Sequence, residues 1–145
     1  MNRLNQFFHD SDTELGVFYP KNHLLAIFPN LTEADRAKEA LNHAGFAGTE
    51  VIAVSGEEVV DFAEDLKLKD GLWGALMTEL SRIFGTEALY ADEDLESAKK
   101  GAAFLAVHCP TEKGKKDAWK FLQPTHPLVA RYYSLCAIEH LVGEV

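Results

Sequence analysis

The chain is short of cysteine and of basic residues. Its 145 residues include two cysteines, Cys109 and Cys136, which are too few for a disulfide framework and lie in apolar runs, where a free thiol usually behaves as a small core residue. The 14 lysine and arginine residues face 23 aspartate and glutamate residues, so the formal net charge is -9. A phosphate-rich partner would be repelled by this charge, which disfavours nucleic-acid binding.

Long apolar runs are also missing. The longest ones, such as residues 24–28, fall far below the roughly 18 to 20 residues of a membrane span. Acidic residues at positions 10, 12 and 14 stand where a signal peptide would have its apolar segment. We therefore expect a cytoplasmic protein with reduced cysteines and no membrane partner. The 47% apolar and 26% charged composition is typical of one globular domain, residues 1–145.

The sequence also lacks the common motifs of catalytic, cofactor and metal sites. The sequence has no G-x-G dinucleotide pattern, no glycine-rich phosphate loop and no G-x-S-x-G nucleophile elbow. Its six histidines are scattered without the spacing of a zinc site. We therefore predict no catalytic residue, no metal and no cofactor.

The first third of the chain has strand and turn signals. Residues 1–14 are mostly polar and are interpreted as an N-terminal arm. Two β-rich runs, residues 15–19 and 23–28, flank a Pro-Lys-Asn turn and predict a hairpin.

A β-α-β pattern continues from the second of these runs. Thr32 with Asp35 predicts the start of a helix, and Gly45 predicts its end. Residues 51–54 form a short apolar run that indicates a buried strand. Residues 15–54 are therefore interpreted as a hairpin joined to a first β-α-β unit.

Residues 55–100 are predicted to be a helical insertion. Ser55 with Glu58 is a capping box, and acidic residues at 92–96 followed by Lys99 and Lys100 favour another helix. Between them an apolar stripe recurs at helical spacing, and its main residues are Trp73, Leu76, Met77, Leu80 and Phe84.

Residues 101–145 have the pattern of a second β-α-β unit. A strand is predicted over residues 102–109, a helix after Pro110 and Thr111, and one long last strand over residues 128–138. Two such units most often interleave as a four-stranded antiparallel sheet with helices on one face, so we predict a ferredoxin-like α+β fold. We interpret four lysines on the second helix as a solvated face rather than a phosphate site: Lys113, Lys115, Lys116 and Lys120.

The other face of this sheet must be covered, because a monomer rarely exposes so large an apolar surface. Either the helix that carries Trp73 folds over it or a second subunit does. We therefore expect a homo-oligomer, most simply a dimer, with the apolar stripe from Trp73 to Phe84 as the candidate interface.

The last predicted strand carries the densest group of polar-tipped side chains. Strand alternation places Arg131, Tyr133 and Glu139 on one face, and Tyr132 and His140 on the other. Together with His108, the residues Arg131, Tyr132 and Tyr133 are the candidate ligand-binding residues, in a pocket between the sheet and the insertion. The alternative is that the tyrosines cover the sheet and Arg131 makes a salt bridge.

His108 stands next to Cys109, and both residue types ligate metals. Neighbours on a strand point to opposite faces, so we interpret both side chains as structural.

Three segments resemble a known family. They are residues 24–28 followed by Thr32-Glu33-Ala34, Gly45-Phe46 before residues 51–54, and Ala130-Arg131-Tyr132-Tyr133 leading to Ile138-Glu139. Over residues 23–140 the chain resembles uncharacterised bacterial proteins similar to the heat-induced general stress protein, the YflT-like domains. The resemblance implies an α+β module with a variable middle and no established reaction. The middle here is rich in large apolar residues, whereas that of the family is often rich in glycine and alanine.

Two functions follow from these expectations. The first is a non-enzymatic, stress-associated or regulatory module that acts by self-association or partner binding. The alternative is a small-molecule binding protein or enzyme whose pocket lies between sheet and insertion.

Overall fold

The computed structural model describes residue 7 and residues 22–62, 90–134 and 138–142 of the chain. The described residues form five strands: β1 (His23–Phe28), β2 (Val51–Val54), β3 (Ala103–His108), β4 (Val129–Tyr133) and β5 (Ile138–Val142). The helices are α2 (Leu31–His43), α5 (Tyr90–Lys99), α6 (Glu112–Leu122) and the short 3-10 helix η3 (Gln123–Thr125). A further helix begins at residue 56 and is described to residue 62.

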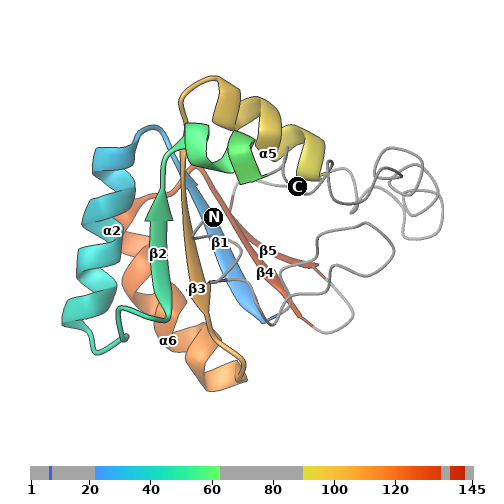
Figure 1. The fold of residues 1–145 in the computed structure, drawn as a ribbon. Helices are drawn as coiled ribbons and strands as arrows, with labels where there is room; N and C mark the ends of the chain where they lie inside the picture. The colour runs from blue at the N-terminus through green and yellow to red at the C-terminus, as the bar shows by residue number, and fades with distance from the viewer. Residues whose placement is uncertain (1–6, 8–21, 63–89, 135–137, 143–145) are drawn as a thin grey trace.

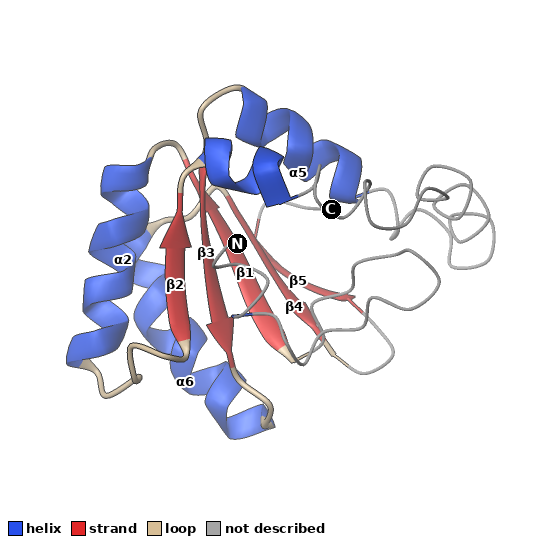
Figure 2. Ribbon diagram, viewed as in Figure 1, coloured by secondary structure: helices blue, strands red, loops and turns tan. Residues whose placement is uncertain are grey.

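The strands form one sheet in the order β2-β3-β1-β4-β5, and each neighbouring pair is antiparallel. Strand β1 of the first β-α-β segment lies between β3 and β4 of the second, so the two segments interleave. Helices stand on both sides of the sheet (Figure 2). The predicted α+β class with an antiparallel sheet is confirmed.

The two faces of the sheet have separate cores, which follow from strand alternation. On the helix face, α2 and α6 cover the sheet (Figure 1). The strand residues of this core include Leu24, Ala26, Phe28, Val51, Ala53, Leu105, Val107, Ala130 and Tyr132. On the opposite side, the insertion face, the core consists of Leu25, Ile27, Ile52, Val54, Phe62, Ala98, Phe104, Ala106 and Tyr133.

Helix α2 begins earlier than its sequence predicts. Asn30 is the N-cap, and its side-chain oxygen accepts a hydrogen bond from the backbone N–H of Glu33 at 3.0 Å. Thr32, which was expected to cap the helix, lies inside it and is exposed. Asn30 follows Pro29 directly, and its extended backbone matches the conformation that an N-cap requires.

Replacing Asn30 by alanine is expected to lower the free energy of unfolding by about 1 kcal/mol, because the first turn of the helix loses the side-chain acceptor of one backbone N–H. Thr32→Ala is the matched control and should change it by less than about 0.5 kcal/mol. Urea denaturation of both variants measures the difference. Equal losses would contradict the assignment of Asn30 as the cap.

The end of α2 follows the sequence prediction. Gly45 has a φ of +107°, which favours glycine, and the backbone N–H of Phe46 donates to the carbonyl of Leu41 at 3.0 Å. Phe46 packs against the core of the helix face. Helix α6 also begins as predicted, since the Thr111 side chain accepts from the N–H of Gly114 at 3.0 Å.

The prediction of one long strand over residues 128–138 is wrong. Strand β4 pairs with β1 from Val129 to Tyr133, where Tyr133 lies opposite His23, the first residue of β1. Beyond that pair the ladder ends, and the chain returns antiparallel to β4 as β5. A strand cannot extend far past its partner without leaving backbone groups unpaired.

The predicted insertion is described only at its two ends. At the first end, the N–H of Glu58 donates to Ser55 Oγ at 3.3 Å, as the capping box predicts. At the second end, α5 lies where the charge pattern indicates a helix. The predicted hairpin strand at residues 15–19 and the candidate interface residues Trp73, Leu76, Met77, Leu80 and Phe84 lie outside the described residues. Among the described residues, no helix is long and apolar enough to cross a membrane.

Candidate functional site

The four candidate ligand-binding residues lie on two different faces of the sheet. Arg131 and Tyr133 are on the insertion face, where Arg131 lies opposite Leu25 and Tyr133 opposite His23. His108 is also opposite His23, from the β3 side. Tyr132 is on the helix face, in the core that α2 and α6 cover. Three of the four therefore share one side of the sheet.

Arg131 is the largest fully buried side chain among the described residues, with 1% of its surface exposed. Its Nη2 donates to both carboxylate oxygens of Asp94 on α5, at 2.6 and 2.5 Å. The guanidinium carbon lies 5.9 Å from the ring centroid of Tyr133. Because the charge is paired with a carboxylate and placed against an aromatic ring, its burial is tolerated. The salt bridge of the alternative interpretation is thus present.

Two histidines lie beside this pair on the insertion face. The ring centroids of His23 and His108 are 4.9 Å apart, and Phe7 from the N-terminal arm lies 5.4 Å from the ring of His23. His23 is fully buried. His23 was not among the candidate site residues, although its position as the first residue of a buried strand opposite His108 is what brings it there.

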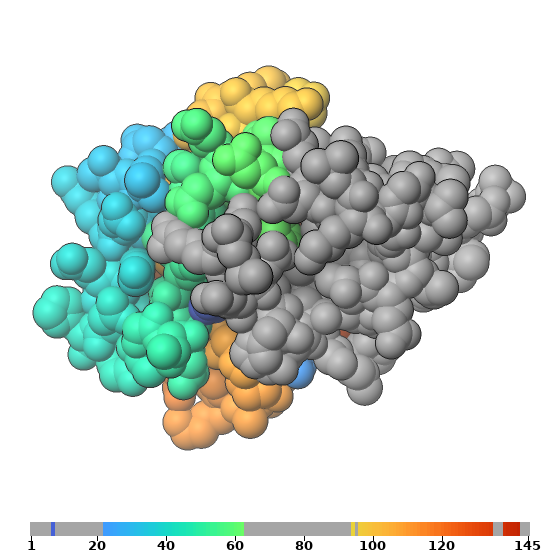
Figure 3. All heavy atoms as spheres, in the orientation of Figure 1, coloured from blue at the N-terminus to red at the C-terminus, as the bar shows by residue number. Residues whose placement is uncertain are grey.

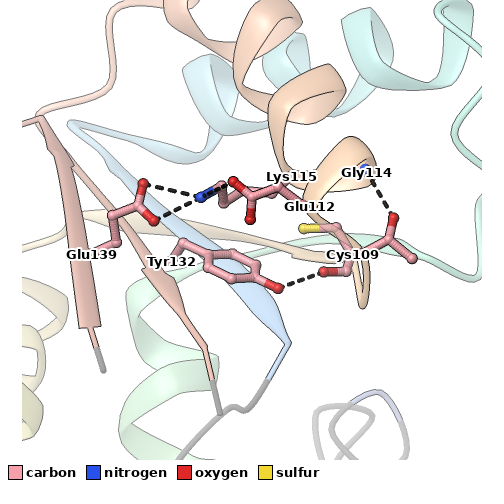
Figure 4. Close-up of polar contacts among 7 residues, drawn as sticks. Cys109, Glu112, Gly114, Lys115, Tyr132 and Glu139 are labelled. Carbon is pink, nitrogen blue, oxygen red and sulfur yellow. Dashed lines mark hydrogen bonds and ion pairs between the residues drawn. The ribbon is translucent and has the colours of Figure 1, made fainter. Parts of the chain in front are cut away.

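A second polar cluster lies on the helix face and joins α6 to β5 (Figure 4). Lys115 Nζ donates to the two carboxylate oxygens of Glu139 at 2.7 and 3.1 Å, and lies 2.9 Å from Oε1 of Glu112. The same ammonium lies 5.3 Å from the ring centroid of Tyr132. The Tyr132 hydroxyl donates to the carbonyl oxygen of Cys109 at 2.8 Å.

This cluster corrects two predictions. Lys115 was expected on a solvated helix face, but its side chain is only 10% exposed, because it shares the buried stripe of α6 with Ala118 and Leu122. Glu139 was expected on the face of Arg131, and His140 on the face of Tyr132. Since the chain reverses after β4, Glu139 lies opposite Tyr132 and His140 opposite Arg131.

The titration of the helix-face cluster follows from its burial. Desolvation by burial raises the pKa of the Cys109 thiol to about 12 and also raises the pKa of Tyr132. The pKa of Lys115 is raised: desolvation opposes the charged form, but the hydrogen bonds that Lys115 donates to Glu139 and Glu112, and the negative charges of these carboxylates, outweigh it. The hydrogen bond from Lys115 lowers the pKa of Glu112.

The Cys109 thiol is poorly suited to attack a substrate. A thiol with a pKa of about 12 holds only a trace of thiolate at neutral pH, and the thiolate is the nucleophile. Cys109 belongs to the core of the helix face, whereas the ring of His108 contacts His23 on the other face. The two neighbours therefore point apart, as strand alternation predicts.

In the part of the chain that the structure describes, no group of three or more His, Cys, Asp or Glu side chains is placed to hold a metal ion. Comparison with known proteins finds no relative: no family model, no curated protein and no solved structure matches this chain. Any function must therefore be argued from these two clusters and from the faces they occupy.

Proposed function

We propose that this protein is a non-enzymatic regulatory module that acts by self-association or partner binding on the insertion side of its sheet. The observation that carries the proposal is that the charged side chains of each cluster form ion pairs within that cluster. Arg131 is held by Asp94, and Lys115 by Glu139 and Glu112. Groups held in this way stabilise and position elements, whereas catalysis needs a group directed at a substrate.

A stress-associated role belongs to the same proposal and rests on the resemblance to YflT-like domains. The finer fold class is proposed as well. Strand order β2-β3-β1-β4, with α2 and α6 on the same face, supports a ferredoxin-like core to which β5 adds an edge strand. Such a fold hosts many functions and selects none of them.

The native mass spectrum of the protein, purified without added ligand, tests the proposal. We expect a dimer or larger oligomer with no additional mass. Trp73→Glu should then reduce the subunit number, because a carboxylate in an apolar interface costs about 2 kcal/mol or more. Leu128→Glu is the control, since Leu128 is 55% exposed and lies outside the insertion. A monomer for the unmodified chain would contradict the self-association part of the proposal.

A second candidate is favoured by one observation. Arg131, Tyr133, His108 and His23 lie on the insertion face, and a small ligand with acidic and aromatic parts could bind there by taking the place of the Asp94 carboxylate at Arg131. A monomer that carries a reproducible additional mass would support this candidate. Tyr133→Phe should then weaken retention of that mass, and Tyr132→Phe, on the other face, should leave it unchanged. Equal effects of the two substitutions would contradict a site on the insertion face.

A further inference from the structure

The two described ends of the insertion lie side by side. A Cβ placed on Gly56 would lie 2.2 Å from the carbonyl oxygen of Ala98 and 2.6 Å from that of Ala102. The helix of residues 56–62 therefore meets the C-terminal end of α5 at backbone contact distance. In the space-filling view the two helices, green and yellow, form a continuous surface (Figure 3). We call residues 55–62 and 90–101 the stems of the insertion.

The stems are attached to the sheet by apolar contacts and by the Arg131–Asp94 ion pair. Phe62 and Ala98 belong to the core of the insertion face. Arg131, from the interior strand β4, reaches Asp94 on α5, whose side chain is 16% exposed. The ion pair joins residues 37 positions apart in the chain and links the second stem to a strand in the middle of the sheet.

The core of the helix face does not depend on the stems. Its buried residues come from α2, α6, the strands and Cys109, and none of them is a described side chain of residues 55–62 or 90–101. A domain with two separate cores can open at one of them while the other stays folded, as local unfolding measured by hydrogen exchange shows in general. The stems are therefore the part whose release would leave the sheet and its two helices intact.

Losing one partner of a buried ion pair destabilises a protein far more than losing both. The Arg131–Asp94 pair can therefore determine whether the stems stay attached to the sheet. Removing one partner leaves an uncompensated charge in a buried place, whereas replacing both by apolar residues is often neutral. An exposed pair has no such asymmetry, because water replaces the lost partner. Lys113–Asp117 on α6, with a Nζ–Oδ2 distance of 2.7 Å and high exposure, provides an exposed pair in the same molecule.

We infer that the Arg131–Asp94 ion pair is a latch that holds the stems on the insertion face, and that breaking it releases both stems while the sheet, α2 and α6 remain folded. The stems carry the insertion through which self-association is proposed, so the regulatory meaning of the latch rests on that proposed function. The latch controls local opening of the stems, and this opening is tested separately from self-association.

Hydrogen exchange followed by mass spectrometry tests the latch with three variants of the full chain. In Asp94→Asn we expect the amides of both stems to exchange about tenfold faster or more, with α2 and α6 changed by less than about twofold. The double variant Arg131→Met with Asp94→Leu should return the stems to nearly the original rates, because neither charge of the pair is left. Asp117→Asn, which breaks the exposed pair, should leave all segments unchanged.

Two results would overturn the latch. One is an unchanged exchange rate of the stems in Asp94→Asn. The other is an equal acceleration in the stems and in α2 and α6, because that would be general destabilisation of the domain. Native mass spectra of the variants and of the unmodified chain decide the proposed function independently: stems that open in Asp94→Asn, together with an unmodified chain that is monomeric, leave the latch standing and contradict self-association.

Discussion

Replacing Gly56 by alanine is expected to lower the free energy of unfolding by about 3 kcal/mol, because overpacking at a close contact forces the backbone to shift. The added Cβ would lie 2.2 Å from the carbonyl oxygen of Ala98 and 2.6 Å from that of Ala102. Both atoms belong to the backbone, so no side chain can rotate to make room. Urea denaturation at neutral pH measures the loss.

Gly48→Ala is the matched control for this prediction. Gly48 is exposed, and a Cβ there would meet no atom within 4 Å. Its replacement should change the free energy of unfolding by less than about 0.5 kcal/mol. If Gly56→Ala were equally mild, the stems of the insertion could not be in backbone contact. Exchange data would add the location, since the loss at Gly56 should appear first in residues 56–62 and 90–99.

The features that were predicted correctly are those that residues within or next to the element determine. Strand β2 is an apolar run of four residues, and all four are buried. Helix α6 follows a proline and a threonine, and Thr111 caps it. Gly45 ends α2 through a positive φ, which few other residues tolerate. In each case the residues that determine the element lie within a few positions of it.

The cap of α2 shows where local signals compete. Thr32-x-x-Asp35 and Asn30-x-x-Glu33 both have the spacing of a capping box, and both precede the same apolar stripe. The structure uses Asn30. The earlier start is the one that follows immediately after β1 and Pro29, so the turn between strand and helix is as short as it can be. The choice of cap therefore depends on the length of the turn between β1 and α2. A helix pattern alone carries no information about that turn.

The face of the sheet on which each candidate residue lies could not be predicted from strand alternation alone. Alternation assigns faces only within one continuous strand, and β4 and β5 are two strands. Glu139 therefore joined Tyr132 and Lys115 rather than Arg131. The actual partner of Arg131, Asp94, lies 37 positions away. No spacing rule connects an insertion helix to a strand of the following unit, so this pair could not be found from the sequence.

The burial of Lys115 could have been found from the sequence. Lys115, Ala118 and Leu122 are spaced as i, i+3 and i+7, which is the spacing of one helix face. The other three lysines of the helix do not share this spacing, although all four carry the same charge. Lys115 alone lies on the stripe, and its long apolar stem accounts for its place there while the ammonium reaches Glu139.

Above pH 9 the fold is expected to lose stability because of Cys109. Its pKa is raised from an ordinary value of 9.0 to about 12 by burial, so the folded state keeps the proton that the unfolded state releases. The stabilisation is complete below pH 9 and is lost as the pH rises toward 12. Since one pKa unit corresponds to about 1.4 kcal/mol, the loss should be about 1.4 kcal/mol at pH 10 and about 4 kcal/mol at pH 12.

Between pH 8 and pH 10 the contribution of the Cys109 thiol to the change in stability can be separated from those of Tyr132 and Lys115. Tyr132 and Lys115 also have raised pKa values, but their ordinary values of 10.0 and 10.5 place their own losses at higher pH. Urea denaturation in a Cys136→Ser background, with and without Cys109→Ala, measures the slope. The variant without Cys109 should lose less than about 0.5 kcal/mol over this range. If both proteins weaken equally, the alkaline loss originates elsewhere and the Cys109 thiol is less buried than its contacts with the helix-face core require.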